Sequence, residues 1–186
     1  MRIISGYLKG RKILEPKNKT TRPLKDLTKE SIFNIIKHSN LFTANFEKSN
    51  VLDLFSGIGS FGLECISRGT KDVIFFEKEP ETLKILKKNI LKLDCQNKTT
   101  IIEKDIFDIK NIDLLSKKKF QIIFLDPPYK EKNLPDLIDK IISLKLLKKQ
   151  GIIIIHRHKK SKDIFTKNFK ILKIKTYGIS KIIFGN

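Results

Sequence analysis

Residues 126–129, with the sequence Asp-Pro-Pro-Tyr, carry the side chains for chemistry at an amine. They directly follow the apolar run 120–125, which predicts a place at the end of a buried strand. Because two prolines supply no N–H donors, the Asp126 carboxylate and the Pro127 carbonyl are left as acceptors. An exocyclic amine of a nucleobase can donate to both while the base stacks on Tyr129. We therefore expect a catalytic set of Asp126, Pro127, Pro128 and Tyr129; the alternative is an ordinary proline turn.

Residues 51–62 form the second stretch of interest, an apolar run followed by the pattern Gly-x-Gly-x-x-Gly. The carboxylate of Asp53 inside the apolar run would be costly to bury without partners. Gly57 and Gly59 allow a tight turn and a close approach of a ligand, at which the following helix would point its free N–H groups. Glu77 lies at the spacing of a ribose-binding acid, about 20 residues on. This geometry serves nicotinamide dinucleotides and S-adenosylmethionine alike.

The elements that must position these residues alternate between strands and helices. Apolar and β-prone runs predict strands, and apolar residues at helical spacing predict helices. We expect strands at 51–55, 73–76, 99–102, 120–125 and 152–155, helices that open at Pro80 and span 134–148 before Gly151, and a strand pair at 169–175 and 181–184. The pattern predicts an α/β fold, a doubly wound, mostly parallel, Rossmann-like sheet of seven strands with an antiparallel last strand.

Ligands bind such sheets at the carboxyl ends of the strands, beside the point where the strand order reverses. Five polar or glycine positions are expected at those ends, namely Asp53, Gly57, Glu77, Asp105 and Asp126. Their convergence on one edge predicts a single site there.

Residues 1–45 are expected to form a small basic extension ahead of a catalytic domain over 46–186. The extension would hold a β-hairpin over 2–14 and a helix over 26–37. Its candidate RNA contacts are Arg2, Lys9, Arg11, Lys12 and Arg22. The hairpin could grip a phosphate backbone, or its lysines could keep a solvated edge from aggregating. The sequence leaves both interpretations open.

The charge balance favours an anionic partner. The chain has 39 basic and 20 acidic residues and a net charge of +19, which is typical of proteins that bind nucleic acid or a membrane surface. Only five of the 39 basic residues are arginines, so part of the lysine excess fits drift in an A/T-rich genome. We interpret the charge as favouring nucleic acid.

Cysteine and histidine usage gives no sign of a metal site. Cys65 and Cys95 lack metal-ligand spacing and predict reduced, structural thiols in the cytoplasm. His156 and His158 form a His-x-His pair without a third ligand nearby, so we interpret them as a plain basic strand end near RNA phosphate and expect no metal. No signal peptide opens the chain, and no apolar run has membrane-spanning length, so no membrane contact is expected.

Four stretches together carry a resemblance to a known group of proteins. They are the opening residues 1–12, the segment 22–34, the glycine loop with its helix at 51–69, and the loop at 125–129. Together they resemble class I, S-adenosylmethionine-dependent amino-methyltransferases of nucleic acids, and most of all the bacterial 16S rRNA guanine-N2 methyltransferase family. The resemblance implies methyl transfer to the exocyclic N2 of a guanine in 16S rRNA, within an assembled or assembling small subunit. We assume a monomer.

The resemblance also implies roles for single residues. Asp53, Gly57 and Gly59 would hold the amino-acid end of the cofactor, Glu77 its ribose, and Asp105 and Ile106 its adenine, with Phe55 and Lys78 also expected in this site. Asp126, Pro127 and Tyr129 would hold the guanine. From its place in an apolar strand alone, the core is the favoured position for Phe55. Two positions depart from the family pattern: Ile58 replaces a small hydroxyl residue, and Leu27 replaces a basic one, which puts a phosphate contact there in doubt.

Three other functions fit parts of the sequence. The Asp-Pro-Pro-Tyr motif also serves methyltransferases acting on N6 of adenine or on other amines of DNA or RNA. A nicotinamide-dependent oxidoreductase would explain the glycine pattern and Glu77 but leaves Asp53 and Asp126 unexplained. A non-catalytic RNA-binding module would explain the charge but not the glycine loop.

Overall fold

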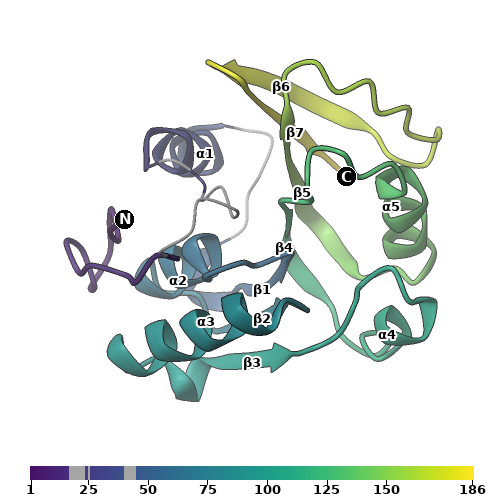
Figure 1. The fold of residues 1–186 in the computed structure, drawn as a ribbon. Helices are drawn as coiled ribbons and strands as arrows, with labels where there is room; N and C mark the ends of the chain where they lie inside the picture. Colours follow the sequence, from purple (N-terminus) through teal and green to yellow (C-terminus); the bar gives the residue numbers. More distant parts are fainter. Residues whose placement is uncertain (17–23, 25, 40–44) are drawn as a thin grey trace.

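The computed structural model describes residues 1–16, 24, 26–39 and 45–186, so the candidate contact Arg22 lies outside the described residues. Within them, one sheet has the strand order β3-β2-β1-β4-β5-β7-β6 (Figure 1). Its strands are β1 (Asn50–Leu54), β2 (Asp72–Phe76), β3 (Thr99–Ile102), β4 (Phe120–Leu125), β5 (Leu147–His158), β6 (Ile171–Tyr177) and β7 (Ser180–Gly185). Neighbours from β3 to β5 are parallel, and β7 is antiparallel to both β5 and β6. The predicted sheet, with its antiparallel last strand, is confirmed.

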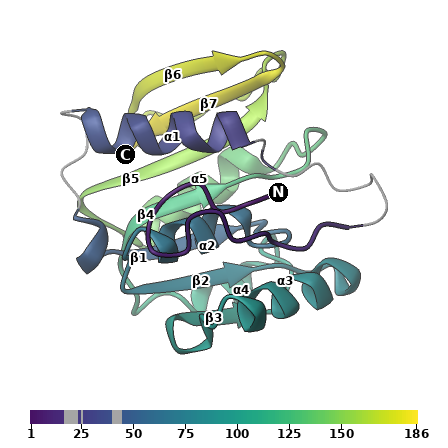
Figure 2. The ribbon, with the colours of Figure 1, turned by 90° about the vertical axis from the view of Figure 1, so that its left-hand side faces the viewer.

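Helices cover both faces of this sheet, as a doubly wound fold requires. The helices are α1 (Asp26–His38), α2 (Ser60–Ser67), α3 (Pro80–Lys92), α4 (Ile109–Asp113) and α5 (Leu134–Ser143). Along β2, Val73 and Phe75 pack into the core under α1, α2 and α3, while Ile74 and Phe76 pack into the core under α4 and α5. Figures 1 and 2 show the two helical layers on opposite sides of the strands. No helix in the described part of the chain is long and apolar enough to cross a bilayer.

The strand order reverses at the centre of the sheet. β1 pairs with β2 on one side and with β4 on the other, so the chain crosses over between β3 and β4. The carboxyl ends of these three central strands therefore meet at one edge, with the crevice that binds ligands in such folds.

The N-terminal segment packs directly on α2. The expected hairpin is reduced to one antiparallel bridge between Arg2 and Lys12, and its turn is tied down where the Tyr7 N–H donates to the Ser67 carbonyl at 2.9 Å. The buried Glu64 carboxylate of α2 accepts the backbone N–H groups of Ile4 and Ser5 at 2.7 and 2.9 Å. The hairpin thus keeps one bridge between its arms and gains contacts to α2. The division at residue 45 stays a prediction.

The structure corrects the predicted end of the last helix. We expected a helix over 134–148 with Gly151 as its stop, but α5 ends at Ser143 and β5 already begins at Leu147. Gly151 lies inside β5, where the register against β4 shifts. A Cβ there would lie 3.0 Å from the Gln121 carbonyl oxygen, so this glycine serves a close strand approach instead of a helix stop.

Candidate active site

A cavity of about 390 Å³ opens at the carboxyl ends of β1, β2 and β4. This volume is within the range of small-molecule sites, roughly 300–1,000 Å³. Eight of the predicted site residues line it, namely Asp53, Phe55, Gly57, Glu77, Asp126, Pro127, Pro128 and Tyr129. Ser56, Ile58, Ser60 and His156 are among the lining residues that were not predicted for the site. The structure therefore brings the glycine loop and the Asp-Pro-Pro-Tyr loop to one cavity.

The glycine loop joins β1 to α2 by residues with left-handed backbone conformations. Gly57 has a φ of +56°, and Gly59 precedes α2 with a φ of +84°. Gly62 serves packing, because a Cβ there would lie 2.3 Å from the Phe75 ring. Phe55 also has a positive φ, +59°, which is costly for an aromatic residue and turns it from the end of β1 to the cavity wall. The half-buried ring of Phe55 lies 5.4 Å from that of Phe107.

Asp53 is a buried carboxylate with an unused oxygen. Its side chain is 1% exposed, and its Oδ2 accepts the Gly62 N–H at 2.9 Å, while its buried Oδ1 has no partner. Burial raises the pKa of Asp53 well above its ordinary value, and the nearby Asp126 and Glu77 raise it further, against the Gly62 hydrogen bond. A free buried acceptor on a cavity wall fits a cationic ligand group, which would satisfy the oxygen and favour its ionised form.

Glu77 ties the end of β2 to the glycine loop. Its Oε2 accepts the Gly57 N–H at 2.7 Å, and its Oε1 accepts the N–H groups of Lys78 and Glu79 at 2.9 Å each. Three backbone donors fix this carboxylate at the cavity wall. Each oxygen keeps further lone pairs, so the group can still accept a hydroxyl of a bound ligand.

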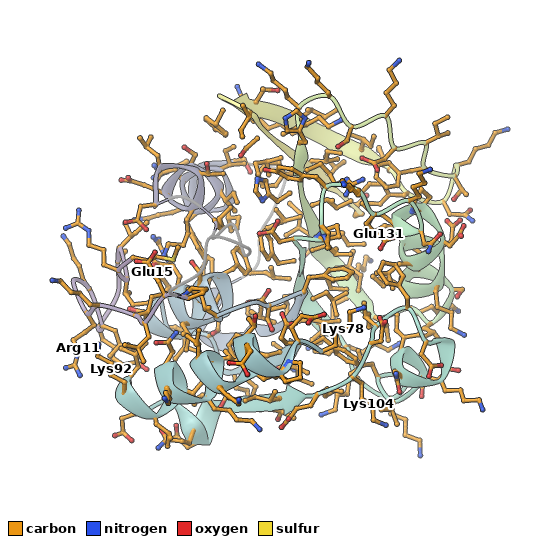
Figure 3. The ribbon with its side chains drawn as sticks, in the orientation of Figure 1. Arg11, Glu15, Lys78, Lys92, Lys104 and Glu131 are labelled. Carbon is orange, nitrogen blue, oxygen red and sulfur yellow. The ribbon has the colours of Figure 1, made fainter. Side chains whose placement is uncertain are left out.

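Four predicted cofactor residues do not line the cavity: Gly59, Lys78, Asp105 and Ile106. Lys78 Nζ and Asp105 Oδ2 form an ion pair at 2.9 Å with both side chains about half exposed (Lys78 is labelled in Figure 3). Partial burial acts to raise the pKa of Asp105, but the hydrogen bonds from Lys78 and from the Phe107 N–H lower it overall. Ile106 is buried in the core under α4 and α5. The adenine contacts implied by the resemblance therefore stay predictions.

The Asp-Pro-Pro-Tyr loop is held by β1 and β5. The Asp126 N–H donates to the Leu54 carbonyl at 3.3 Å, which joins the ends of β4 and β1. The Asp126 Oδ1 lies 2.7 Å from Nδ1 of His156 on β5. The Tyr129 ring stands edge-on to the ring of His158 at 5.2 Å. Asp126 therefore enters the cavity with one oxygen already engaged.

The end of β5 corrects our interpretation of His156 as a plain basic strand end. His156 is only 5% exposed, and Arg157 only 3%, because β5 continues past its apolar run with both residues inside the fold. Arg157 donates to the carbonyls of Pro128 and Glu131 at 3.0 and 2.8 Å. Its guanidinium also donates one hydrogen bond to each carboxylate oxygen of Asp163. The signal that could have revealed His156 was its place at the carboxyl end of a central strand, next to Asp126. Among the described residues, no group of three or more His, Cys, Asp or Glu could hold a metal ion.

The four described RNA-contact candidates, Arg2, Lys9, Arg11 and Lys12, are exposed. The turn between them lies against the last residue of α2, Ser67, whereas the cavity lies at the start of this helix. Eight residues of α-helix span about 12 Å, so these side chains lie to one side of the cavity. In Figure 3 Arg11 lies beside Lys92, to whose carbonyl it donates at 3.3 Å.

The topology, the glycine loop after β1 and the Asp-Pro-Pro-Tyr loop after β4 define a class I methyltransferase with a Rossmann-like fold. The chain belongs to the family described as Conserved hypothetical protein 95, whose sequence model matches residues 1–186.

The sequence is 31% identical over 183 residues to ribosomal RNA small subunit methyltransferase D of Haemophilus influenzae, an alignment that covers 96% of this chain and 90% of that protein. A hypothetical protein of Thermus thermophilus shares the fold with a TM-score of 0.79 at 20% identity, over 99% of this chain and 98% of that one. SMU.776, solved in complex with S-adenosylhomocysteine, shares it with a TM-score of 0.65 at 17% identity, over 85% of this chain and 49% of that one.

Proposed function

We propose that this chain transfers a methyl group from S-adenosylmethionine to the exocyclic N2 of a guanine in 16S rRNA. One observation carries the proposal: a single cavity is lined both by Asp53, whose buried Oδ1 has no partner, and by the four residues of the Asp-Pro-Pro-Tyr loop. The first fits the cationic amino group of the cofactor, and the second fits a substrate amine. Similarity over nearly the whole chain to small subunit methyltransferase D supports the choice of RNA.

The residues present fit the cofactor. Asp53 would accept its ammonium group, the loop of Gly57 and Gly59 would let it approach the backbone, and Glu77 would accept its ribose hydroxyls. Phe55, which lines the cavity, and Lys78, Asp105 and Ile106, which lie outside its lining, would complete the site around its adenine. When bound, S-adenosylmethionine supplies an electrophilic methyl group. The complex of SMU.776 with S-adenosylhomocysteine supports this choice of ligand over a nicotinamide dinucleotide.

The Asp-Pro-Pro-Tyr loop would bind and orient the substrate amine. Asp126 and the Pro127 carbonyl accept hydrogen bonds from the two amine protons, while Pro128 shapes the loop and Tyr129 stacks on the base. Holding the amine this way directs its lone pair at the methyl group and favours the positive charge that develops on nitrogen. The extra proton on the methylated nitrogen then leaves to Asp126 or to water.

The substrate is expected to be 16S rRNA within an assembled or assembling small subunit. The net charge of +19 and the exposed basic side chains of the hairpin support a phosphate contact beside the cavity. The free buried thiols of Cys65 and Cys95 are in keeping with a cytoplasmic protein. We propose that the enzyme acts as a monomer.

Labelled methyl transfer separates this function from its alternatives. The wild-type protein should transfer methyl groups from labelled S-adenosylmethionine to small-subunit RNA, and S-adenosylhomocysteine but not NAD should raise its melting temperature. Asp126→Ala should abolish transfer and leave the affinity for S-adenosylhomocysteine within about threefold of wild type, below the tenfold that 1.4 kcal/mol represents. A collapse of that affinity in Asp126→Ala would contradict the role given to Asp126, and stabilisation by NAD alone would favour an oxidoreductase.

A further inference from the structure

His156 connects the reactive loop to the far side of the sheet. Its Nδ1 lies 2.7 Å from Asp126 Oδ1, and its Nε2 lies 2.9 Å from Ser180 Oγ. Both His156 and Ser180 are buried. Asp126 follows β4, His156 lies on β5 and Ser180 begins β7, so three neighbouring strands hold one hydrogen-bonded chain that ends in the cavity.

The Asp126 carboxylate selects the tautomer of a neutral imidazole ring. An ionised carboxylate only accepts hydrogen bonds, so the proton on the Asp126 side belongs to Nδ1 of His156. In the neutral ring Nε2 then accepts the hydroxyl proton of Ser180. With Oδ1 engaged by His156, Asp126 has Oδ2 left for an incoming amine. Both ring nitrogens are used, so the ring plane is fixed as well as its position.

From this geometry we propose that His156 is a positioning residue for methyl transfer, which fixes the Asp126 carboxylate so that Oδ2 meets the substrate amine. Ser180 contacts the other ring nitrogen, Nε2, and so helps to fix the plane of the imidazole. The proposal rests on the proposed function for the role of Asp126. His156 lies on β5, outside the Asp-Pro-Pro-Tyr motif, and holds the Asp126 side chain of that motif in place.

The neighbouring residue shows that β5 is built to support this loop. His156 contacts the Asp126 side chain, whereas Arg157 donates to the carbonyls of Pro128 and Glu131. Alternate residues of a strand point to opposite faces, so two consecutive positions hold the carboxylate from one side and the loop backbone from the other. Packing alone does not require a histidine to contact Asp126, the carboxylate that we place at the substrate amine.

Two near-isosteric variants test the proposal. The amide of His156→Asn can donate from the place of Nδ1, whereas that of His156→Gln reaches the place of Nε2 and contacts Ser180 instead. We expect kcat to stay within about threefold of wild type in His156→Asn and to fall about 10- to 100-fold in His156→Gln, because small misplacements of a reacting group reach 10²-fold. The affinity for S-adenosylhomocysteine and the melting temperature should be alike in the two variants. Equal kcat values would overturn the proposal.

The Asp126→Asn background separates positioning from general stability. There His156→Gln should reduce the residual rate less than twofold, because the carboxylate that it positions is already gone. A further 10-fold loss would show that His156 acts independently of Asp126, which contradicts the proposal.

NMR of the histidine rings tests the contact between His156 and Asp126 without any substrate. The chain has only three histidines, so ¹⁵N NMR of the imidazoles can assign the ring of His156. We expect the Nδ1–H tautomer in wild type and a changed Nδ1 signal in Asp126→Asn. An Nε2–H tautomer, or a signal that does not respond to Asp126, would refute the contact itself. A wild-type enzyme that methylates another base, or none, would refute the proposed function while leaving this NMR result to stand.

Discussion

Asp53→Asn tests whether the buried carboxylate of β1 binds the cofactor at a cost to the stability of the fold. The substitution removes the charge but keeps the shape of the side chain and an oxygen for the Gly62 N–H. In the ligand-free protein the ionised Asp53 has one buried oxygen without a partner, a situation that costs about 1–3 kcal/mol. The amide nitrogen of the variant lacks a partner at the same place but carries no charge, so we expect the variant to be as stable as wild type or more stable by up to about 2 kcal/mol. Its melting temperature should rise by up to about 8 °C, at ~2–4 °C per kcal/mol for a domain of this size.

Cofactor binding should change in the opposite direction. A hydrogen bond between charged groups contributes about 1.5–3 kcal/mol, which is roughly a 10- to 150-fold change in affinity. Calorimetric titration with S-adenosylhomocysteine measures this loss, and differential scanning calorimetry of the unliganded protein measures the stability. Asp72→Asn, an exposed carboxylate at the opposite end of the neighbouring strand, should change neither quantity and serves as the matched control. Binding by Asp53→Asn within about twofold of wild type, below the 1.4 kcal/mol of a tenfold change, would refute the role of Asp53.

The raised pKa of Asp53 adds a pH dependence to the same prediction. The folded protein holds this proton more tightly than the unfolded chain, so the stability from Asp53 is present below its unfolded pKa and is lost as the pH rises through its folded pKa. Affinity for S-adenosylhomocysteine should rise over the same interval, because the ionised form accepts the ammonium group. Asp53→Asn should flatten both profiles. A wild-type affinity that falls with pH in this interval would contradict the assignment.

Three further changes test other parts of the site. Glu77→Ala should weaken S-adenosylhomocysteine binding about 10-fold or more, since one charged hydrogen bond is lost; unchanged calorimetric affinity would remove Glu77 from the ribose site. Arg157→Met should destabilise the fold by about 3–5 kcal/mol in denaturant titrations, because the buried carboxylate of Asp163 then loses its charged partner. A change below about 1 kcal/mol would show that the pair is solvated. Charge reversal at Arg2, Arg11 and Arg22 should weaken RNA binding and reduce its salt dependence by about one unit of slope per lost phosphate contact; an unchanged slope would exclude the hairpin from the RNA interface.

The sequence predicted the sheet well because its signals are local and agree with one another. Each central strand is a short apolar run, and polar residues such as Asp53, Glu77 and Asp126 follow or interrupt these runs where the strands meet at one edge. Parallel pairing then brings them together without further information. Asp53 is buried between its apolar neighbours, as its place in the run indicates, and one of its carboxylate oxygens has no partner.

Other features depend on contacts between distant segments and could not be predicted this way. Gly151 has the pattern of a helix stop, but its close approach to β4 depends on strand register. His156 opens a basic run and gives no apolar signal, although pairing with β7 keeps β5 regular and buries this residue beside Ser180. The hairpin needs α2 to complete its hydrogen bonds, so its reduction to a single bridge follows from packing.

Nucleoside mass spectrometry identifies the methylated base and so tests the assigned reaction. Small ribosomal subunits from a strain that lacks this methylation are incubated with the protein and labelled S-adenosylmethionine, and the RNA is digested to nucleosides. We expect label in N2-methylguanosine of 16S rRNA with the wild-type protein, and none with Asp126→Ala. Label in N6-methyladenosine or another base would contradict the assigned substrate. No label in any RNA or DNA, together with no binding of S-adenosylhomocysteine, would contradict the assigned activity.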